Sequence, residues 1–205
     1  MLQELIDQAN TNPNNTSISP ITNNFVRSGD KASTKPKRRK TTLLDGATDW
    51  KLLVEIGEDK IVYPPEIVST PKRPDIVIWS SQLKRVINGE LTCPAEEGIE
   101  AAQIRKEASY FELKCSAKDR WWASEVATIE VGARGYVART VPRLLKRLGR
   151  ESRLVSVDIK NLSVIAARCT YAIYLARESR GWDVHRELLG KETVLTAVPD
   201  PPPQT

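Results

Sequence analysis

The stretch KRPDIVIWSSQLKRVINGELTCP, residues 72–94, decides the fold of this chain. Its two runs of branched apolar residues, 75–79 and 85–92, predict two strands joined by a tight connection. The pair Asn88-Gly89 inside the second run is also typical of a type I′ hairpin turn. A turn at that pair would leave two very short strands, so we expect one continuous strand over 85–92.

Two acids lie toward the ends of these predicted strands. Asp75 opens the first run and Glu90 lies near the end of the second, so neighbouring strands with a short connection can bring both carboxylates close together. Paired carboxylates suit a hard divalent cation such as Mg²⁺ or Mn²⁺, which can activate water for attack on a phosphodiester. Acids at strand ends are also commonly plain solvent-facing charges, and the spacing leaves both interpretations open.

A nuclease site of this kind also uses a lysine, which neutralises the charge that develops on the phosphate. The position two residues after Glu90, where the common nuclease arrangement has this lysine, is Thr92. The nearest basic replacements are Arg105 and Lys106, on the helix that we expect to follow. If the helical stripe that carries Lys106 faces the sheet, its side chain extends toward the carboxylates.

Hydrophobic periodicity predicts the remaining elements. Alternating or branched apolar runs favour strands, and apolar residues at intervals of three and four favour helices. The predicted elements are strands over 50–57, 60–68 and 124–132 and helices over 96–118, 139–149 and 151–178. This order of strands and helices predicts an α/β fold with a mixed central sheet flanked by helices.

Both ends of the chain differ in composition from its middle. Residues 8–42 are rich in Asn, Ser, Thr, Pro and Lys, and such a segment buries too little apolar surface to offset its ordering entropy. We therefore expect a disordered basic tail over 1–45, a folded domain over 49–182 and a proline-rich C-terminal extension over 183–205. Removal of residues 8–42 should then leave the melting temperature nearly unchanged.

Positive charge is concentrated in the predicted tail. The chain has a formal net charge of +5, but its first 40 residues hold seven Lys/Arg against three Asp/Glu, and the rest is nearly balanced. A nucleic-acid surface on the folded domain must therefore be a local patch. The candidate phosphate contacts are Lys37, Arg38 and Arg39 in the tail and Arg139, Arg143 and Lys146 on one face of a predicted helix. The tail cluster can also be a solvated run of charges, and the helix face is more simply a solvated face over a core stripe.

Three features of the sequence favour an intracellular, nuclear protein. The three cysteines show no CxxC spacing, and the start of the chain lacks a basic region followed by an apolar one, so we expect a reducing compartment and no secretory signal. The basic cluster over 35–40 resembles a nuclear-import signal, which favours the nucleus.

Trp121 and Trp122 can stack on bases, but large aromatic residues are more often buried, so we expect them to pack in the core. We expect DNA as the partner, and neither a membrane nor a small-molecule cofactor.

An ordered series of segments carries a resemblance to a known family. The segments are RPDIVIW (73–79), ELTCPAEEGIEAAQIRKEASY (90–110), IEVGARGYV (129–137) and RLLKRLG (143–149), and fourteen residues separate Asp75 from Glu90. Over residues 50–182 the chain resembles the restriction-like endonuclease domain at the C-terminal end of non-LTR retrotransposon polyproteins, and its stand-alone genomic remnants. That family belongs to the PD-(D/E)xK superfamily.

The resemblance implies a restriction-endonuclease-like fold and magnesium-dependent DNA cleavage. Pro74 and Asp75 match the PD pair of the motif, and Glu90 matches its second acid. Lys106 matches a lysine that has migrated to the following helix, and Tyr110 matches an aromatic residue one turn later. Asp75, Glu90 and Lys106 are thus the expected catalytic residues, and Asp75 and Glu90 the expected metal ligands.

The chain departs from the family pattern at a few positions. Ser109 replaces the usual lysine before the tyrosine, Asn88 and Gly89 replace hydrophobic residues ahead of the glutamate, and Ala95 replaces an aromatic residue. These changes keep two alternatives open beside a retrotransposon-derived endonuclease. One is a catalytically inactive nuclease fold that binds nucleic acid or protein, and the other is a non-functional transposon remnant.

Overall fold

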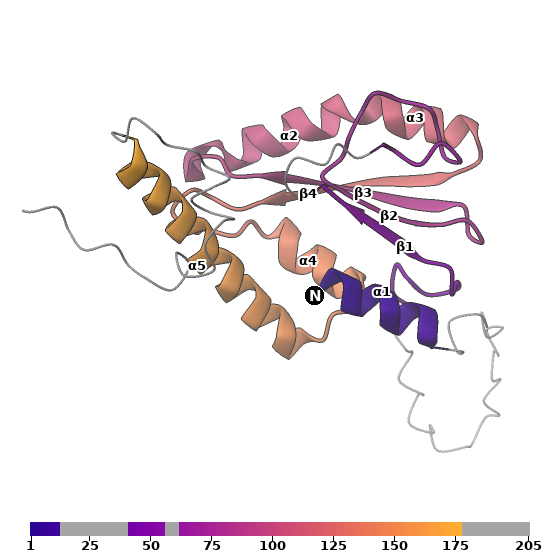
Figure 1. Ribbon diagram of the computed structural model, residues 1–205, viewed down its shortest axis with the longest axis horizontal. Coiled ribbons are helices and arrows are strands. Elements are labelled where there is room, and N and C mark those ends of the chain that lie inside the picture. The colour runs from indigo at the N-terminus through magenta and orange to yellow at the C-terminus, as the bar shows by residue number, and fades with distance from the viewer. Residues whose placement is uncertain (13–40, 56–61, 178–205) are drawn as a thin grey trace, which may run out of the picture.

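The computed structural model describes residues 1–12, 41–55 and 62–177 (Figure 1). In that part of the chain, four strands form one sheet in the order β1-β2-β3-β4. Their bounds are β1 Lys51–Val54, β2 Ile76–Ser80, β3 Arg85–Thr92 and β4 Ala123–Glu130. The first three strands pair antiparallel, and β3 pairs parallel with β4. The predicted mixed sheet is therefore confirmed.

Helices cover both faces of the sheet (Figure 1). One layer holds α2 (Ile99–Ser109) and α3 (Phe111–Asp119), and the opposite layer holds α1 (Leu2–Thr11) and α4 (Thr140–Arg147). The long helix α5 (Ser152–Ala176) packs its Val155 against Val141 and Leu145 of α4. These layers confirm the α/β class.

The hairpin of β2 and β3 is built as expected, with one continuous second strand. Residues 81–84 form the turn, and β3 runs unbroken through Asn88 and Gly89. Asn88 is fully buried, and its side-chain carbonyl accepts a hydrogen bond of 3.0 Å from the hydroxyl of Tyr63. Gly89 allows the two strands to approach, because a Cβ there would lie 3.0 Å from the Cβ of Ile76. Both residues therefore have a packing reason to interrupt the apolar pattern.

The strand predicted over 60–68 is wrong for the described residues 62–68. Pro64 and Pro65 have no N–H for a strand ladder, and the chain turns there, with the Ile67 N–H donating to the Pro64 carbonyl at 3.0 Å. Tyr63 and Ile67 are buried in the layer between the sheet and the helices α2 and α3. The apolar run is thus a core-filling loop.

The single helix predicted over 96–118 is interrupted. A 3₁₀ turn, η2 (Glu96–Gly98), leads into α2, and Tyr110 separates α2 from α3 with φ −101° and ψ 4°. The hydroxyl of Tyr110 donates a hydrogen bond of 3.1 Å to the carbonyl of Arg73, so the break anchors the helices to the segment before β2. The helices predicted over 139–149 and 151–178 are confirmed as α4 and α5 within the described residues.

The N-terminal region is a correction to the predicted disordered tail over 1–45. Residues 2–11 form α1, and Leu5 and Ile6 are buried with Leu44 of the segment that precedes β1. The predicted tail over 1–45 extended the polar composition of 8–42 to the start of the chain, where Leu2, Leu5, Ile6 and Ala9 recur at intervals of three and four. Residues 13–40, with the candidates Lys37, Arg38 and Arg39, lie outside the described part, as does the predicted extension over 183–205.

A paired hydrogen bond holds α1 against the start of the sheet. The Asn10 amide nitrogen donates to the Trp50 carbonyl at 2.8 Å, and the Trp50 N–H donates to the Asn10 side-chain oxygen at 2.8 Å. The Trp50 indole N–H donates in turn to the Leu44 carbonyl at 2.7 Å. The ordered domain therefore begins before residue 49, with α1 as part of it.

Candidate active site

The pairing of β2 with β3 places Asp75 and Glu90 opposite each other. Ile76 pairs with Gly89, so the next pair outward is Asp75 with Glu90, and opposed residues of antiparallel strands project to the same face. The Leu91 N–H donates to Oδ2 of Asp75 at 2.7 Å, which ties this carboxylate to β3 beside Glu90. The structure thus brings the two predicted ligands to one end of one face.

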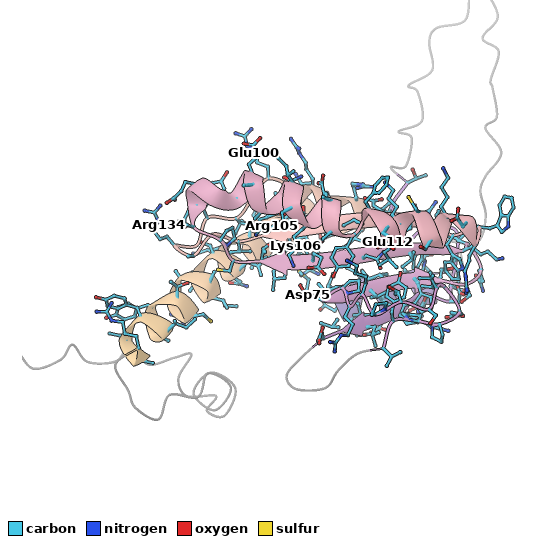
Figure 2. All side chains as sticks on the ribbon, turned by 90° about the horizontal axis from the view of Figure 1, so that it is seen from above. Asp75, Glu100, Arg105, Lys106, Glu112 and Arg134 are labelled. Carbon is cyan, nitrogen blue, oxygen red and sulfur yellow. The ribbon has the colours of Figure 1, made fainter. Side chains whose placement is uncertain are left out.

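Lys106 completes this group from the helical layer above. Its Nζ lies 2.6 Å from Oε2 of Glu90, whose side chain is only 2% exposed. Lys106 stands on the side of α2 that faces the sheet, above the sheet end that carries Asp75 (Figure 2). The expected reach of Lys106 is therefore observed, whereas its neighbour Arg105 is exposed.

A third acid, Glu55, joins the row and was missed in the sequence. Val54 pairs with Ile76 and the Glu55 N–H donates to the Asp75 carbonyl at 2.8 Å, so Glu55 lies opposite Asp75 on the side of β1. Glu55, Asp75 and Glu90 therefore form a row of acids across three strands. The register that aligns them is a tertiary property, and no local pattern around Glu55 indicates it.

Tyr110 lies against these acids. Burial raises the pKa of its phenol well above the usual value, and the hydrogen bonding and charge of Glu90, followed by the charges of Asp75 and Glu55, raise it further. Tyr110 is thus held as a neutral donor at physiological pH. Its bond to the Arg73 carbonyl positions the backbone that delivers Asp75 to the site.

The oxygen atoms at this end of the sheet fit a hard cation. Oε1 of Glu90 is buried and accepts no hydrogen bond from the described part of the chain, and such an orphaned acceptor normally has a partner. Mg²⁺ commonly uses one or two carboxylates and completes its shell with water and substrate phosphate. Among the described residues no group of three or more His, Cys, Asp or Glu is arranged to hold a metal ion. A cation here would therefore depend on Asp75, Glu90 and non-protein oxygens.

Glu66, an acid in the Pro64–Val68 turn, has a structural role. One of its oxygens accepts the indole N–H of Trp79 at 2.6 Å and the other accepts the Ser81 hydroxyl at 3.1 Å. The hydrogen bond from Trp79 lowers the pKa of Glu66. Its hydrogen bonds secure the loop to the β2–β3 hairpin and leave it outside the row of acids.

The predicted basic face of α4 lies in the layer opposite Lys106. Arg139, Arg143 and Lys146 are all exposed, and none forms an ion pair within the described ranges. Because α4 and α2 cover opposite faces of the sheet (Figure 1), the structure does not gather this face and the candidate catalytic group on one surface.

The Lys106–Glu90 pair gives a stability prediction. Lys106→Met should lower the free energy of unfolding in urea by about 3 kcal/mol, because it leaves a buried carboxylate without its partner. Adding Glu90→Gln should restore most of the loss, since it removes the unpaired charge. The matched control is Arg105→Met on the exposed side of the same helix, which should change stability by less than about 0.5 kcal/mol. An unchanged unfolding midpoint for Lys106→Met would show that the ion pair does not stabilise the folded protein.

Comparisons with protein-family models, curated proteins and solved structures find no match for this chain. The resemblance to the retrotransposon endonuclease domain stays a prediction, based on the segments that carry it. In the described residues no helix is long and apolar enough to cross a membrane.

Proposed function

We propose that this protein is a metal-dependent DNA endonuclease with a restriction-endonuclease-like core. The observation that carries the proposal is the contact of 2.6 Å between Lys106 and Glu90, opposite Asp75 on the paired strand. Two carboxylates and an ammonium group from three separate elements converge at one end of the sheet. This combination suits hydrolysis of a phosphodiester better than it suits a packing role, because burial of Glu90 costs stability unless it is used or fully paired.

Each residue has a chemical task in this proposal. Asp75 and Glu90 would hold Mg²⁺ or Mn²⁺, an ion that supplies an activated water and neutralises charge on the phosphate. Lys106 holds Glu90 in place, and its ammonium group would neutralise charge that develops on the phosphate. Tyr110 positions Arg73 and Asp75 through its backbone contact. The end of β1 adds Glu55, which increases the negative field that attracts a cation.

A nicking assay on supercoiled plasmid tests the proposal. The full chain should convert supercoiled to open-circular DNA with Mg²⁺ or Mn²⁺ and should stop when a chelator is added. A chain that is folded by circular dichroism and binds DNA, but nicks with neither ion, would refute the endonuclease.

A catalytically inactive DNA-binding module is the second candidate. The observation that favours it is that Oε2 of Glu90 is already engaged by Lys106 while the side chain is 2% exposed, so a cation must compete with a formed ion pair. This module would bind DNA in chelator, would gain no affinity when Mg²⁺ is added, and would never nick the DNA.

The exposed face of α4 gives a binding prediction under either candidate. Replacing Arg139, Arg143 and Lys146 together by Ala should weaken duplex binding and reduce the slope of log affinity against log salt by up to about 2.7, since each phosphate contact contributes roughly 0.9. A salt series by fluorescence anisotropy measures this slope. The control is Lys160→Ala on the exposed surface of α5. Identical slopes for the triple variant and the parent would show that the α4 face is only solvated.

A further inference from the structure

Two helices of this protein end in the same backbone motif. At the end of α4, the Gly149 N–H donates to the Lys146 carbonyl at 3.1 Å and the Arg150 N–H donates to the Leu145 carbonyl at 2.9 Å. Gly149 has φ +95°, the left-handed conformation that this Schellman motif requires at its first residue past the helix cap. Glycine is the usual residue there because it has no Cβ to clash.

At the end of α3 the same motif carries a tryptophan at the glycine position. The Trp121 N–H donates to the Lys118 carbonyl at 2.9 Å and the Trp122 N–H donates to the Ala117 carbonyl at 3.0 Å. Trp121 has φ +66°, which is strained for a residue with a bulky side chain. A bulky residue, poorly suited to positive φ, therefore stands where α4 uses glycine.

Packing does not account for Trp121. Trp122 makes the hydrophobic contact that accompanies this motif, because it is buried in the same core cluster as Ala117. Trp121 is 85% exposed, the largest exposed fraction among the large hydrophobic residues of the described segments. The structure thus corrects the expectation that both tryptophans are buried. A strained, rigidly anchored and solvent-facing indole is a candidate for binding, since strain that folding does not explain is often retained for function.

Exposed cations lie on the segments next to Trp121. Lys114 and Lys118 lie one turn apart on α3, and Arg120 precedes Trp121 directly. Lys84 joins them from the β2–β3 turn, because the Ala123 N–H donates to its carbonyl at 2.7 Å. All four cations are exposed and none forms an ion pair within the described residues, while Asp119 is the one acid in residues 114–121. The surface has the charge that complements a phosphate backbone.

We propose that Trp121, Lys84, Lys114, Lys118 and Arg120 form a contact site for single-stranded nucleic acid. The indole stacks on an unpaired base, which is a sequence-tolerant contact, and the cations neutralise the flanking phosphates. Lys84 directly precedes β3, and Glu90 lies six residues further along the chain, so the two are at most about 20 Å apart at the rise of a strand. This inference rests on the proposed endonuclease function. It specifies the substrate as DNA with unpaired bases within about 20 Å of the acids.

Binding of a fluorescent oligo-dT to the full chain, measured by anisotropy in chelator, tests the site. Trp121→Gly should weaken binding by about five-fold or more, the loss expected for one base stack, and Trp121→Phe should retain most of the affinity. The control is Tyr171→Ala, which removes an exposed aromatic residue of α5 and should bind like the parent. Replacing Lys114, Lys118 and Arg120 by Ala should reduce the salt slope by up to about two, at roughly 0.7 per contact on a single strand.

A second readout separates binding from folding. Because glycine relieves the strain at φ +66° and the indole has little packing to lose, Trp121→Gly should raise the melting temperature by about 2–4 °C. A fall in melting temperature would show that Trp121 supports the fold and would overturn the inference. Equal oligo-dT affinity for Trp121→Gly and the parent would overturn it too. A parallel assay uses vesicles that contain phosphatidylserine. If Trp121→Gly loses binding to these vesicles and keeps its oligo-dT affinity, Trp121 contacts lipid and the inference is overturned. The oligo-dT assay is carried out in chelator, so its result does not depend on catalysis. It still tests the Trp121 site if the protein fails to nick plasmid DNA.

Discussion

Asp75→Asn should abolish plasmid nicking, with a loss of at least about a thousand-fold, while the protein stays folded and bound to DNA. Asparagine keeps a side-chain oxygen that can accept the Leu91 N–H, so the local structure survives. It removes the charge that would hold a divalent cation, and one lost ligand removes several kcal/mol of transition-state stabilisation. Duplex affinity in chelator should be unchanged or slightly higher, because a negative charge has left the phosphate site.

The matched control for this experiment is Glu100→Gln. Glu100 is an exposed acid on α2 that lies away from Asp75 (Figure 2), so its loss of charge should leave the nicking rate within about two-fold of the parent. If Asp75→Asn nicks at the parent's rate, the paired carboxylates are not the catalytic centre. If both variants lose activity equally, the effect comes from surface charge in general.

Replacing Leu5 and Ile6 of α1 by Ala should destabilise the whole domain by at least about 4 kcal/mol. Both side chains are at most 5% exposed and pack into the core cluster with Leu44 and Trp50, and each such truncation typically costs 2–5 kcal/mol. The melting temperature should fall by roughly 10 °C. This outcome is the opposite of what a disordered N-terminal tail predicts.

A control on the same helix isolates the effect of packing. Gln8→Ala replaces an exposed residue of α1 with a good helix former, so the melting temperature should stay within about 2 °C of the parent. Differential scanning calorimetry measures all three proteins. If the double variant melts with the parent, α1 does not contribute to the stability of the sheet.

Local pattern was enough to predict the centre of the fold. The apolar residues on either side of the 81–84 turn predicted two strands, and the observed bounds of β3 followed once Asn88-Gly89 was assigned to the strand and not to a turn. Helical spacing allowed Lys106 to reach the carboxylates if its stripe faced the sheet, and its Nζ lies 2.6 Å from Oε2 of Glu90. These features depend on neighbours within one element or two adjacent elements, which a sequence shows directly.

The features that were missed depend on contacts between distant segments. Glu55 becomes part of the acid row only through the register of β1 with β2, and α1 gains its stability from Trp50, forty residues away. Tyr110 breaks a helix that spacing alone extends, because its hydroxyl is fixed to Arg73. In each case tertiary context overrides local preference.

The attachment of the chain beside α4 has a consequence for avidity. The Leu43 N–H donates to the Arg147 carbonyl at 2.7 Å, so Leu43 lies at the end of the helix that presents Arg143 and Lys146. Lys37 is six residues before Leu43 and can lie no more than about 22 Å from it, whatever path the chain takes. If the protein binds DNA as proposed, this short connection gives the second basic group a high effective concentration once the first is bound. Their contributions to DNA affinity should multiply, as in a bivalent ligand whose second contact needs no second encounter.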